Sequence, residues 1–245
     1  MKKIFVEIFA RIWAAWGLIT FIITFLLFLI PSLLCYFIPG YKGQHIFILI
    51  SKIWMKVWLT IIGCRVIVKG KEHFKKNTAY IVTCNHNALL DVPLSSPFIP
   101  GGNKTIAKTS FAKIPIFGLY YKKGSVLVDR RNDASRRKSF EEMRKVLAQG
   151  MHMCIYPEGT RNRSQEPLKK FYDGAFKLSV DTGVAIIPAV IFNTKKAMPI
   201  NKKFYLLPQV LQIHFLAPIL PKDLSFEDLN KKVFAVMKDY YLTHQ

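Results

Sequence analysis

The chain has 245 residues, of which 51% are hydrophobic, and its 36 lysines and arginines against 15 acidic residues give a formal net charge of +21. A mean hydropathy of +0.20 excludes a disordered basic tail, and the composition excludes collagen-like chains and disulfide scaffolds. A charge of this size and sign suits a nucleic acid or an anionic membrane surface as partner.

The first apolar stretch is residues 12–39, in which no charged residue occurs. A helix of this length could cross a hydrocarbon core of about 30 Å. It is also too long for the apolar part of a signal peptide. Pro31 is expected to bend or end this helix.

The second apolar stretch is residues 46–64, interrupted by Lys52 and Lys56. These lysines are four residues apart and form one basic stripe on a helix, while Trp54 and Trp58 lie on a different side. A helix with a basic stripe and aromatic side chains suits the membrane interface better than the bilayer centre.

Together the two stretches predict that residues 1–64 form a two-helix membrane anchor, in which the first helix inserts and the second lies at the surface. A single true span and a pair of buried core helices in a soluble protein are the alternatives. Basic residues flank the first stretch on both sides, so the positive-inside rule is indecisive, which fits a hairpin with both ends in the cytoplasm. Residues 65–245 carry most of the charge and are predicted to form a separate globular domain.

Beyond residue 64, short strand-like segments alternate with amphipathic ones. This alternation indicates an α/β fold with a mostly parallel or mixed sheet flanked by helices. Strands are predicted over residues 65–69, 78–84, 104–107, 125–128, 153–156, 184–192 and 209–215, and helices within 86–97 and over 133–149, 171–181 and 225–241. Asp133 or Ser135 is expected to cap the second of these helices. The last helix has an apolar face of Phe226, Leu229, Val233, Val236 and Met237.

The four cysteines are Cys35, Cys64, Cys84 and Cys154, and no two have the spacing of a redox or zinc motif. We therefore expect reduced, buried thiols and neither a disulfide framework nor a metal site.

The first candidate site is Asn85-His86-Asn87-Ala88-Leu89-Leu90-Asp91, which directly follows a predicted buried strand. Positions five apart on a helix differ by about 140°, so His86 and Asp91 can meet only if His86 lies on the loop and Asp91 on the first turns. Such an Asp would orient the imidazole and stabilise its cation, which makes a general base. The pair alone is weak evidence, because a structural histidine is the commoner case.

The second candidate site is Tyr156-Pro157-Glu158-Gly159-Thr160-Arg161-Asn162-Arg163-Ser164, at the end of another predicted strand. Guanidinium groups bind two oxygens of a phosphate at once, so these arginines suit a phosphate ligand. Glu158 could position an arginine or a substrate hydroxyl. A solvated turn with an ion pair is an equally good reading of this segment alone.

Two further segments follow the same strand-end pattern. Residues 124–131 form a short predicted strand that ends in charge, where Arg130 is the one site candidate of a basic stretch. Residues 184–189 are apolar and by themselves predict no more than a buried strand.

In this order, the segments resemble the blocks of the glycerolipid acyltransferase family, in particular its 1-acylglycerol-3-phosphate acyltransferase group. His86–Asp91 looks like the family's NHx4D block and the YPEGTR run at 156–161 like its third block; residues 124–130 and 184–188 look like the second and fourth. Lys108 with Ile114-Pro115-Ile116-Phe117-Gly118 resembles the segment between the first two. The resemblance covers about residues 65–195, and Ala185 departs from it where many members have a proline.

The resemblance implies transfer of a fatty acyl group from acyl-CoA or acyl-carrier protein to the free hydroxyl of lysophosphatidic acid, giving phosphatidic acid, with no metal or other cofactor. His86 would be the base and Asp91 its orienting partner. The glycerol phosphate would be bound by Lys108, Arg130, Glu158, Gly159, Thr160 and Arg161. Members with a two-helix membrane motif before the α/β domain agree with the anchor, so we expect an enzyme on the cytoplasmic face of the inner membrane, with membrane phospholipids and no nucleic acid as partners.

Three alternatives remain at this point. The acceptor could be another lysophospholipid or a lyso-aminolipid, since such relatives share the same blocks. The chain could be a non-catalytic basic protein that binds membranes or nucleic acid, although no nucleic-acid-binding motif is evident. It could also be a hydrolase with Cys84 as nucleophile, although no nucleophile-elbow motif is present.

Overall fold

The computed structural model describes residues 2–129 and 131–244, and its centre is a seven-stranded sheet of order β1-β7-β6-β2-β5-β3-β4. Neighbouring strands pair in parallel except β6 and β7, which are antiparallel. The predicted mixed α/β sheet is therefore confirmed. The strands are β1 (Arg65–Lys69), β2 (Ile81–Cys84), β3 (Asn103–Lys108), β4 (Ser125–Val128), β5 (His152–Ile155), β6 (Ile186–Phe192) and β7 (Val210–Phe215).

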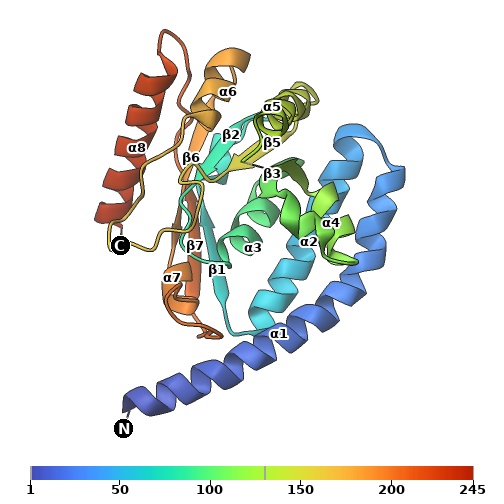
Figure 1. Ribbon diagram of the computed structural model, residues 1–245, viewed down its shortest axis with the longest axis vertical. Helices are drawn as coiled ribbons and strands as arrows, with labels where there is room; N and C mark the ends of the chain where they lie inside the picture. The colour runs from blue at the N-terminus through green and yellow to red at the C-terminus, as the bar shows by residue number, and fades with distance from the viewer. Residues whose placement is uncertain (1, 130, 245) are drawn as a thin grey trace.

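Helices cover both faces of the sheet (Figure 1). They are α1 (Lys2–Leu34), α2 (Gly40–Ile61), α3 (Asp91–Ser95), α4 (Phe117–Lys123), α5 (Asp133–Ala148), α6 (Gly174–Thr182), α7 (Thr194–Ala197) and α8 (Phe226–Thr243). Short 3-10 turns lie at Cys35–Phe37, Lys71–His73, Ser96–Phe98 and Thr109–Lys113.

Alternating residues of the central strands feed two separate cores, as the pleat of a sheet requires. On β2, Ile81 packs with side chains of α5, α6 and α8, whereas Val82 and Cys84 pack with side chains of α1, α2 and α3. Every residue of β2, β5 and β6 is buried. The strands that carry the candidate site therefore have helices packed on both faces.

The strand and helix bounds differ from the predicted ones mainly at their starts. β2 begins at Ile81 instead of 78, where its pairing with β5 and β6 begins. The cap of α5 is Asn132, whose side chain accepts from the Ser135 amide at 2.9 Å, so neither predicted cap is right. On α8, Leu229 and Met237 are buried as predicted, but Val236 is 37% exposed.

The helices α1 and α2 pack against each other, and the two predicted interface tryptophans point inward. Trp54 and Trp58 are 3% and 6% exposed. The Trp54 indole donates to Thr24 Oγ1 at 2.9 Å, and the Trp58 indole donates to the Gly17 carbonyl at 3.0 Å. The expectation that these aromatic rings face a membrane interface is therefore wrong, because their N–H groups find partners inside the protein.

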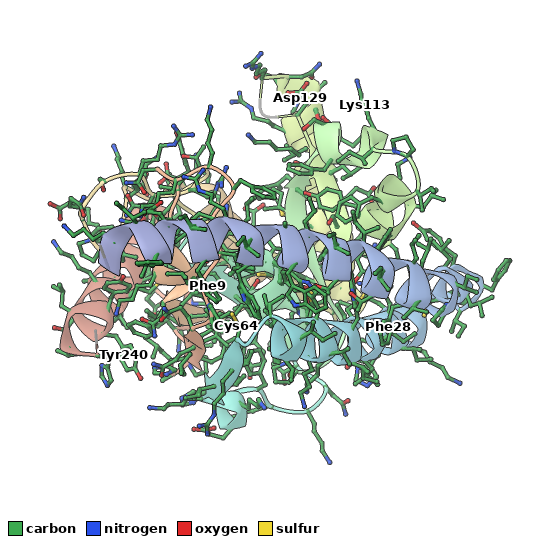
Figure 2. All side chains as sticks on the ribbon, turned by 90° about the horizontal axis from the view of Figure 1, so that it is seen from below. Phe9, Phe28, Cys64, Lys113, Asp129 and Tyr240 are labelled. Carbon is green, nitrogen blue, oxygen red and sulfur yellow. The ribbon has the colours of Figure 1, made fainter. Side chains whose placement is uncertain are left out.

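The outer side of α1 is apolar along its length. Lys3–Phe37 is long and apolar enough to cross a bilayer by length and composition, and Figure 2 shows α1 running across the molecule. Pro31 does not end the helix at once, since α1 continues to Leu34 and places the proline in its last turn. The exposed large side chains are Ile4, Phe5, Val6, Ile8, Phe9, Ile12, Trp16, Leu18, Ile19, Ile22, Ile23, Leu26, Leu27, Ile30 and Leu34.

The inner sides of α1 and α2 belong to the core of the sheet. Met55 and Leu59 of α2 share one buried cluster with Val82, Ile187 and Leu206. The boundary at residue 64 stays a prediction, but the hydrophobic core is continuous across it. Contact of the N-terminal helices with a membrane would therefore also orient the sheet.

Candidate active site

The candidate site lies where the parallel strands β2, β5 and β3 end. Thr83 of β2 pairs with Ile155 of β5, so the loops that follow these strands start side by side. In open α/β sheets, ligands bind outside the carboxyl ends of the strands. The topology therefore brings the two predicted site segments, residues 85–91 and 156–164, together.

His86 and Asp91 meet as the sequence predicts, with His86 on the loop and Asp91 as the first residue of α3. His86 Nδ1 lies 2.8 Å from Asp91 Oδ2. The same oxygen accepts from the amides of Asn87 at 2.5 Å and Ala88 at 2.7 Å. Because the fully buried carboxylate accepts from Nδ1, Nε2 is left to take a proton, and the His86 side chain is 19% exposed.

Glu158 lies beneath this loop, where it is fully buried. Its Oε1 accepts from the His86 amide at 2.8 Å, and its Oε2 accepts from the Lys169 amide at 3.0 Å. The Asn162 amide in turn donates to the His86 carbonyl at 2.6 Å. The backbone amide and the backbone carbonyl of His86 are therefore both hydrogen-bonded to the segment after β5. Burial raises the pKa of Glu158 to about 7.

Tyr156 and Asn85 are site residues whose roles were not predicted. The Tyr156 ring lies 4.5 Å from the His86 ring, and its hydroxyl bonds to Ser95 Oγ at 2.6 Å. The Asn85 side chain makes two hydrogen bonds to the backbone of Ile191, at 2.7 and 3.0 Å. Both residues stand inside the predicted blocks, but their contacts depend on packing between distant segments. The Tyr156 ring packs against the imidazole of His86, and Asn85 joins the loop that carries His86 to β6.

His86 opens onto a cavity of about 1400 Å³. Four of the predicted binding residues line it, namely Lys108, Gly159, Thr160 and Arg161, whereas Asp91 and Glu158 lie behind its wall. Arg130 lies outside the described residues. The ionisable residues of the wall are mainly basic, and none of the described residues that line it is acidic. Its further cations are Arg163, Lys169, Lys202 and Lys203.

The basic residues of the wall that were not predicted from the sequence differ in the bonds they already make within the protein. Lys169 Nζ donates to Thr160 Oγ1 at 2.8 Å, which places a lysine on the predicted phosphate segment. Lys202 is already paired with Glu7 of α1. Lys169 stands in an irregular stretch five residues after the second candidate segment, and no motif of its own marks its role.

Much of the rest of the cavity wall is apolar, and α1, α2 and α4 supply a large part of it. Among its polar groups, Ser51 and Tyr120 bond to each other at 2.7 Å, and burial raises the pKa of the Tyr120 hydroxyl. The apolar and aromatic lining residues from these helices are Ala14, Leu18, Phe21, Phe47, Ile48, Trp54, Met55, Trp58, Phe117, Tyr120 and Tyr121. A polar headgroup and a hydrocarbon chain could therefore occupy the same cavity.

The cysteines are free and buried, as predicted. Cys84 is fully buried with its sulfur 3.9 Å from that of Cys154, and this neighbour together with burial raises the pKa of the Cys84 thiol. A buried, protonated thiol is a poor nucleophile, so the geometry speaks against a cysteine hydrolase. Among the described residues, no group of three or more His, Cys, Asp or Glu could hold a metal ion.

The comparisons with known proteins agree with one another. Residues 65–192 match the family model described as Acyltransferase. A 1-acyl-sn-glycerol-3-phosphate acyltransferase of Cocos nucifera is 32% identical over 181 residues, which are 73% of this chain and 57% of that protein. One of Borreliella burgdorferi is 32% identical over 147 residues, 57% of this chain and 56% of that protein. The chain thus spans somewhat more than half the length of these curated relatives.

A similar solved structure covers the whole chain. The crystal structure of the 1-acyl-sn-glycerophosphate (LPA) acyltransferase PlsC from Thermotoga maritima aligns with a TM-score of 0.79 and 25% sequence identity, over 100% of this chain and 99% of that one. The N-terminal helices therefore have counterparts in that structure, as the α/β layers do.

Proposed function

Because the chain belongs to the acyltransferase family, we propose that it moves a fatty acyl group from a thioester donor to the free hydroxyl of lysophosphatidic acid, giving phosphatidic acid. The donor is acyl-CoA or acyl-carrier protein. The observation that carries the proposal is the pair His86–Asp91, 2.8 Å apart at a cavity lined by both basic and apolar residues. This arrangement suits an acceptor with both a phosphate and a hydrocarbon chain.

In the proposed reaction, His86 Nε2 takes the proton of the acceptor hydroxyl as its oxygen attacks the thioester carbonyl. Asp91 stabilises the imidazolium that forms. When the tetrahedral intermediate collapses, the new C–O ester bond remains, the C–S bond breaks, and the leaving sulfur receives the proton from the imidazolium. The protein needs no covalent nucleophile, because the substrate hydroxyl attacks directly.

The basic residues of the cavity wall are the proposed site of the acceptor phosphate. Arg161 and Lys108 supply charge there, and Thr160 and Lys169 add hydrogen-bond donors. Arg130 stays part of this proposal on the strength of its place in the sequence. Glu158 contributes by holding the His86 loop, and direct contact between its carboxylate and the substrate stays a prediction.

The apolar outer side of α1 supports association with a membrane. We place the enzyme on the cytoplasmic face of the inner membrane, where a thioester donor in solution can reach an acceptor held in the bilayer. The +21 net charge adds attraction to anionic lipid, at about 1 kcal/mol for each basic residue near the surface.

The test is direct assay of the purified chain with lysophosphatidic acid and a panel of acyl-CoA and acyl-carrier thioesters, with analysis of the lipid products. Phosphatidic acid should form, and folded His86→Ala protein should form none above background. Parallel reactions with lysophosphatidylethanolamine and lysophosphatidylcholine distinguish the acceptors, since the basic cavity wall favours the phosphomonoester. No lipid product with any pair, or equal activity in His86→Ala, would contradict the proposal.

A further inference from the structure

The segment between β3 and β4 carries large apolar side chains that the fold leaves about half exposed. Phe111, Ile114, Ile116 and Leu119 are 42%, 45%, 53% and 50% exposed, and we call these four side chains the 111–119 patch. Large apolar groups gathered on a short surface segment mark a contact with another apolar body.

The backbone of this segment holds the patch outward under strain. Ile116 has φ 62° and ψ −58°, and the Phe117 amide donates to the Pro115 carbonyl at 2.6 Å, which makes a γ-turn of the rare, strained hand. A β-branched residue with positive φ is a genuine outlier. Gly118 folds the segment back closely, since a Cβ there would lie 2.3 Å from the Ala112 carbonyl oxygen. The exposed Ile116 is thus held in a defined place.

The segment that carries the patch is joined to the N-terminal helices. The Tyr36 hydroxyl donates to the Leu119 carbonyl at 2.8 Å, and the rings of Phe25 and Phe117 lie 5.7 Å apart. Beside this junction Leu34 is 56% exposed. These contacts place the segment of the patch next to α1 and the turn that follows it.

The charges around the patch fit an anionic lipid surface. Lys108, Lys113 and Lys122 are exposed at its borders, and Lys113 is labelled in Figure 2. No aspartate or glutamate occurs from residue 92 to residue 128. Apolar side chains rimmed by lysine and free of acid are the pattern of an interfacial membrane contact.

We propose that the 111–119 patch is a second bilayer contact, which docks the α/β layers directly on an anionic lipid surface beside α1. This membrane contact goes beyond the proposed function, and its role in catalysis rests on that function. Phe111 and Phe117 also line the cavity, so the segment of the patch adjoins the proposed active site. Contact at both α1 and the patch fixes the tilt of the molecule, so the cavity wall between them stays at the lipid surface.

Depth-dependent quenching tests the contact without any turnover. Ile114→Cys and Leu119→Cys can each be labelled with a polarity-sensitive dye, because all four native cysteines are buried, and labelled wild-type protein gives the background. Leu242→Cys on α8 is the matched control, with Leu242 55% exposed. The probe is a vesicle of phosphatidylcholine and phosphatidylglycerol, with and without nitroxide-labelled acyl chains.

Dyes at positions 114 and 119 should shift to the blue on vesicle addition and be quenched by the nitroxide lipids, while the dye at 242 is unaffected. The same result is expected in a His86→Ala background, so failure of the proposed reaction leaves this test intact. Equal quenching of all three dyes by aqueous iodide on vesicles, with none by nitroxide lipid, would overturn the proposal. So would a blue shift that follows protein concentration without lipid, which assigns the patch to a second copy.

A functional readout uses the double variant Ile114→Ser/Leu119→Ser, whose residues do not line the cavity. Its KM for a long-chain acceptor held in vesicles should rise about tenfold, since two partly buried apolar side chains are lost from the contact. Its KM for a short-chain, water-dispersed acceptor should not change. The control Leu220→Ser/Leu242→Ser should match wild type with both; an equal rise for both acceptors in the test variant would contradict a membrane role.

Discussion

The helices α1 and α8 cover opposite faces of one sheet and differ in the kind of side chain that they expose. On α8, large side chains such as Leu229 and Met237 point inward, and lysines such as Lys231 and Lys238 point outward. On α1, by contrast, large apolar side chains such as Ile12, Ile19 and Leu27 point outward, while Phe21 and Phe25 pack inward. The contrast indicates that α8 is built for water and α1 for an apolar medium.

The inner side of α1 strengthens this contrast. It presents small residues to the protein, including Ala10 at 0% and Ala14 at 8% exposure. A Cβ on Gly17 would lie 2.6 Å from the Leu206 side chain. Small residues where two helices approach closely are typical of helices that pack within a membrane. The hydropathy of α1 alone does not distinguish this arrangement from a buried core helix.

The largest effect should come from Asp91→Asn, which stops the chemistry of the site and leaves both surfaces intact. An amide that donates to His86 Nδ1 selects the wrong tautomer, so kcat should fall by about a thousandfold or more. Vesicle binding should be unchanged. Turnover assays and sedimentation with vesicles measure the two; loss of both together would mean that catalysis and docking are not separable in this way.

A direct challenge to the contrast between the helices is the double substitution Ile19→Lys/Ile23→Lys on the outer side of α1. Two charges placed in the apolar contact should lower partition into neutral phosphatidylcholine vesicles by about a hundredfold. The same charges on α8, in Val236→Lys/Leu242→Lys, should have no effect. Equal losses in the two variants would show that α1 is no more a lipid helix than α8.

The substitution Glu158→Gln tests, through the pH dependence of the free energy of unfolding, how the buried site differs from the solvated surface. Burial raises the pKa of Glu158 from its ordinary value of 4.5 to about 7, so the folded protein binds more protons than the unfolded chain between these values. The free energy of unfolding should therefore fall as pH rises from about 4.5 to about 7, by up to about 3 kcal/mol from this group. The variant should lose that slope in urea unfolding; an unchanged slope would place the titration elsewhere.

The ionised form of Glu158 accepts from the backbone amides of His86 and Lys169. Deprotonation therefore lowers the stability of the protein but strengthens the hydrogen bond that holds the His86 loop. Wild-type activity should rise through this pKa as pH increases. The variant should be less active at pH 8, since its amide nitrogen cannot accept a hydrogen bond, with little change in KM. A raised KM at unchanged kcat would instead support direct contact between Glu158 and substrate.

Arg161→Ala should raise the KM for the phosphate-bearing acceptor about tenfold, because a charge-assisted hydrogen bond is lost. Arg144→Ala is the control, since Arg144 pairs with Asp181 at 3.3 Å on the water-facing helices. Steady-state kinetics with varied acceptor measure both, and an unchanged KM in Arg161→Ala would remove this residue from the phosphate site.

The smallest expected effect is that of Trp54→Phe, which removes the indole bond to Thr24 inside the helical pair. The free energy of unfolding should fall by about 1 kcal/mol. Trp16→Phe on the lipid side, where the indole is 45% exposed and its bond to Ile61 is 3.4 Å long, should change it less. Chemical denaturation in detergent measures both; equal losses would mean that the two sides of α1 are equally protein-packed.

The sequence was informative where local pattern and chemistry coincide. His86 before a helix and Asp91 at its start follow from spacing alone, and β4 at Ser125–Val128 follows from the apolar run after Gly124. The mixed sheet follows from alternating elements.

What the sequence could not supply depends on contacts between distant segments. The direction of Trp54 requires Thr24 on another helix, and the role of Glu158 requires the His86 amide, 72 positions away. The helix α4 was not predicted, because its seven residues are too few for a periodic pattern and it is held by contacts to α1. Sequence spacing predicts contacts within one or two helical turns, whereas these residues make contacts between segments that are distant in the sequence.

The ion pair between Glu7 and Lys202 also bears on how the chain is made. The two residues are 195 positions apart, and at about 5–20 residues per second the ribosome needs roughly 10–40 s to complete the interval. During that time α1 has emerged but its inner side has no sheet to cover. We expect α1 to rest on the bilayer first and the remaining chain to fold against it, so that the membrane serves as a template for assembly.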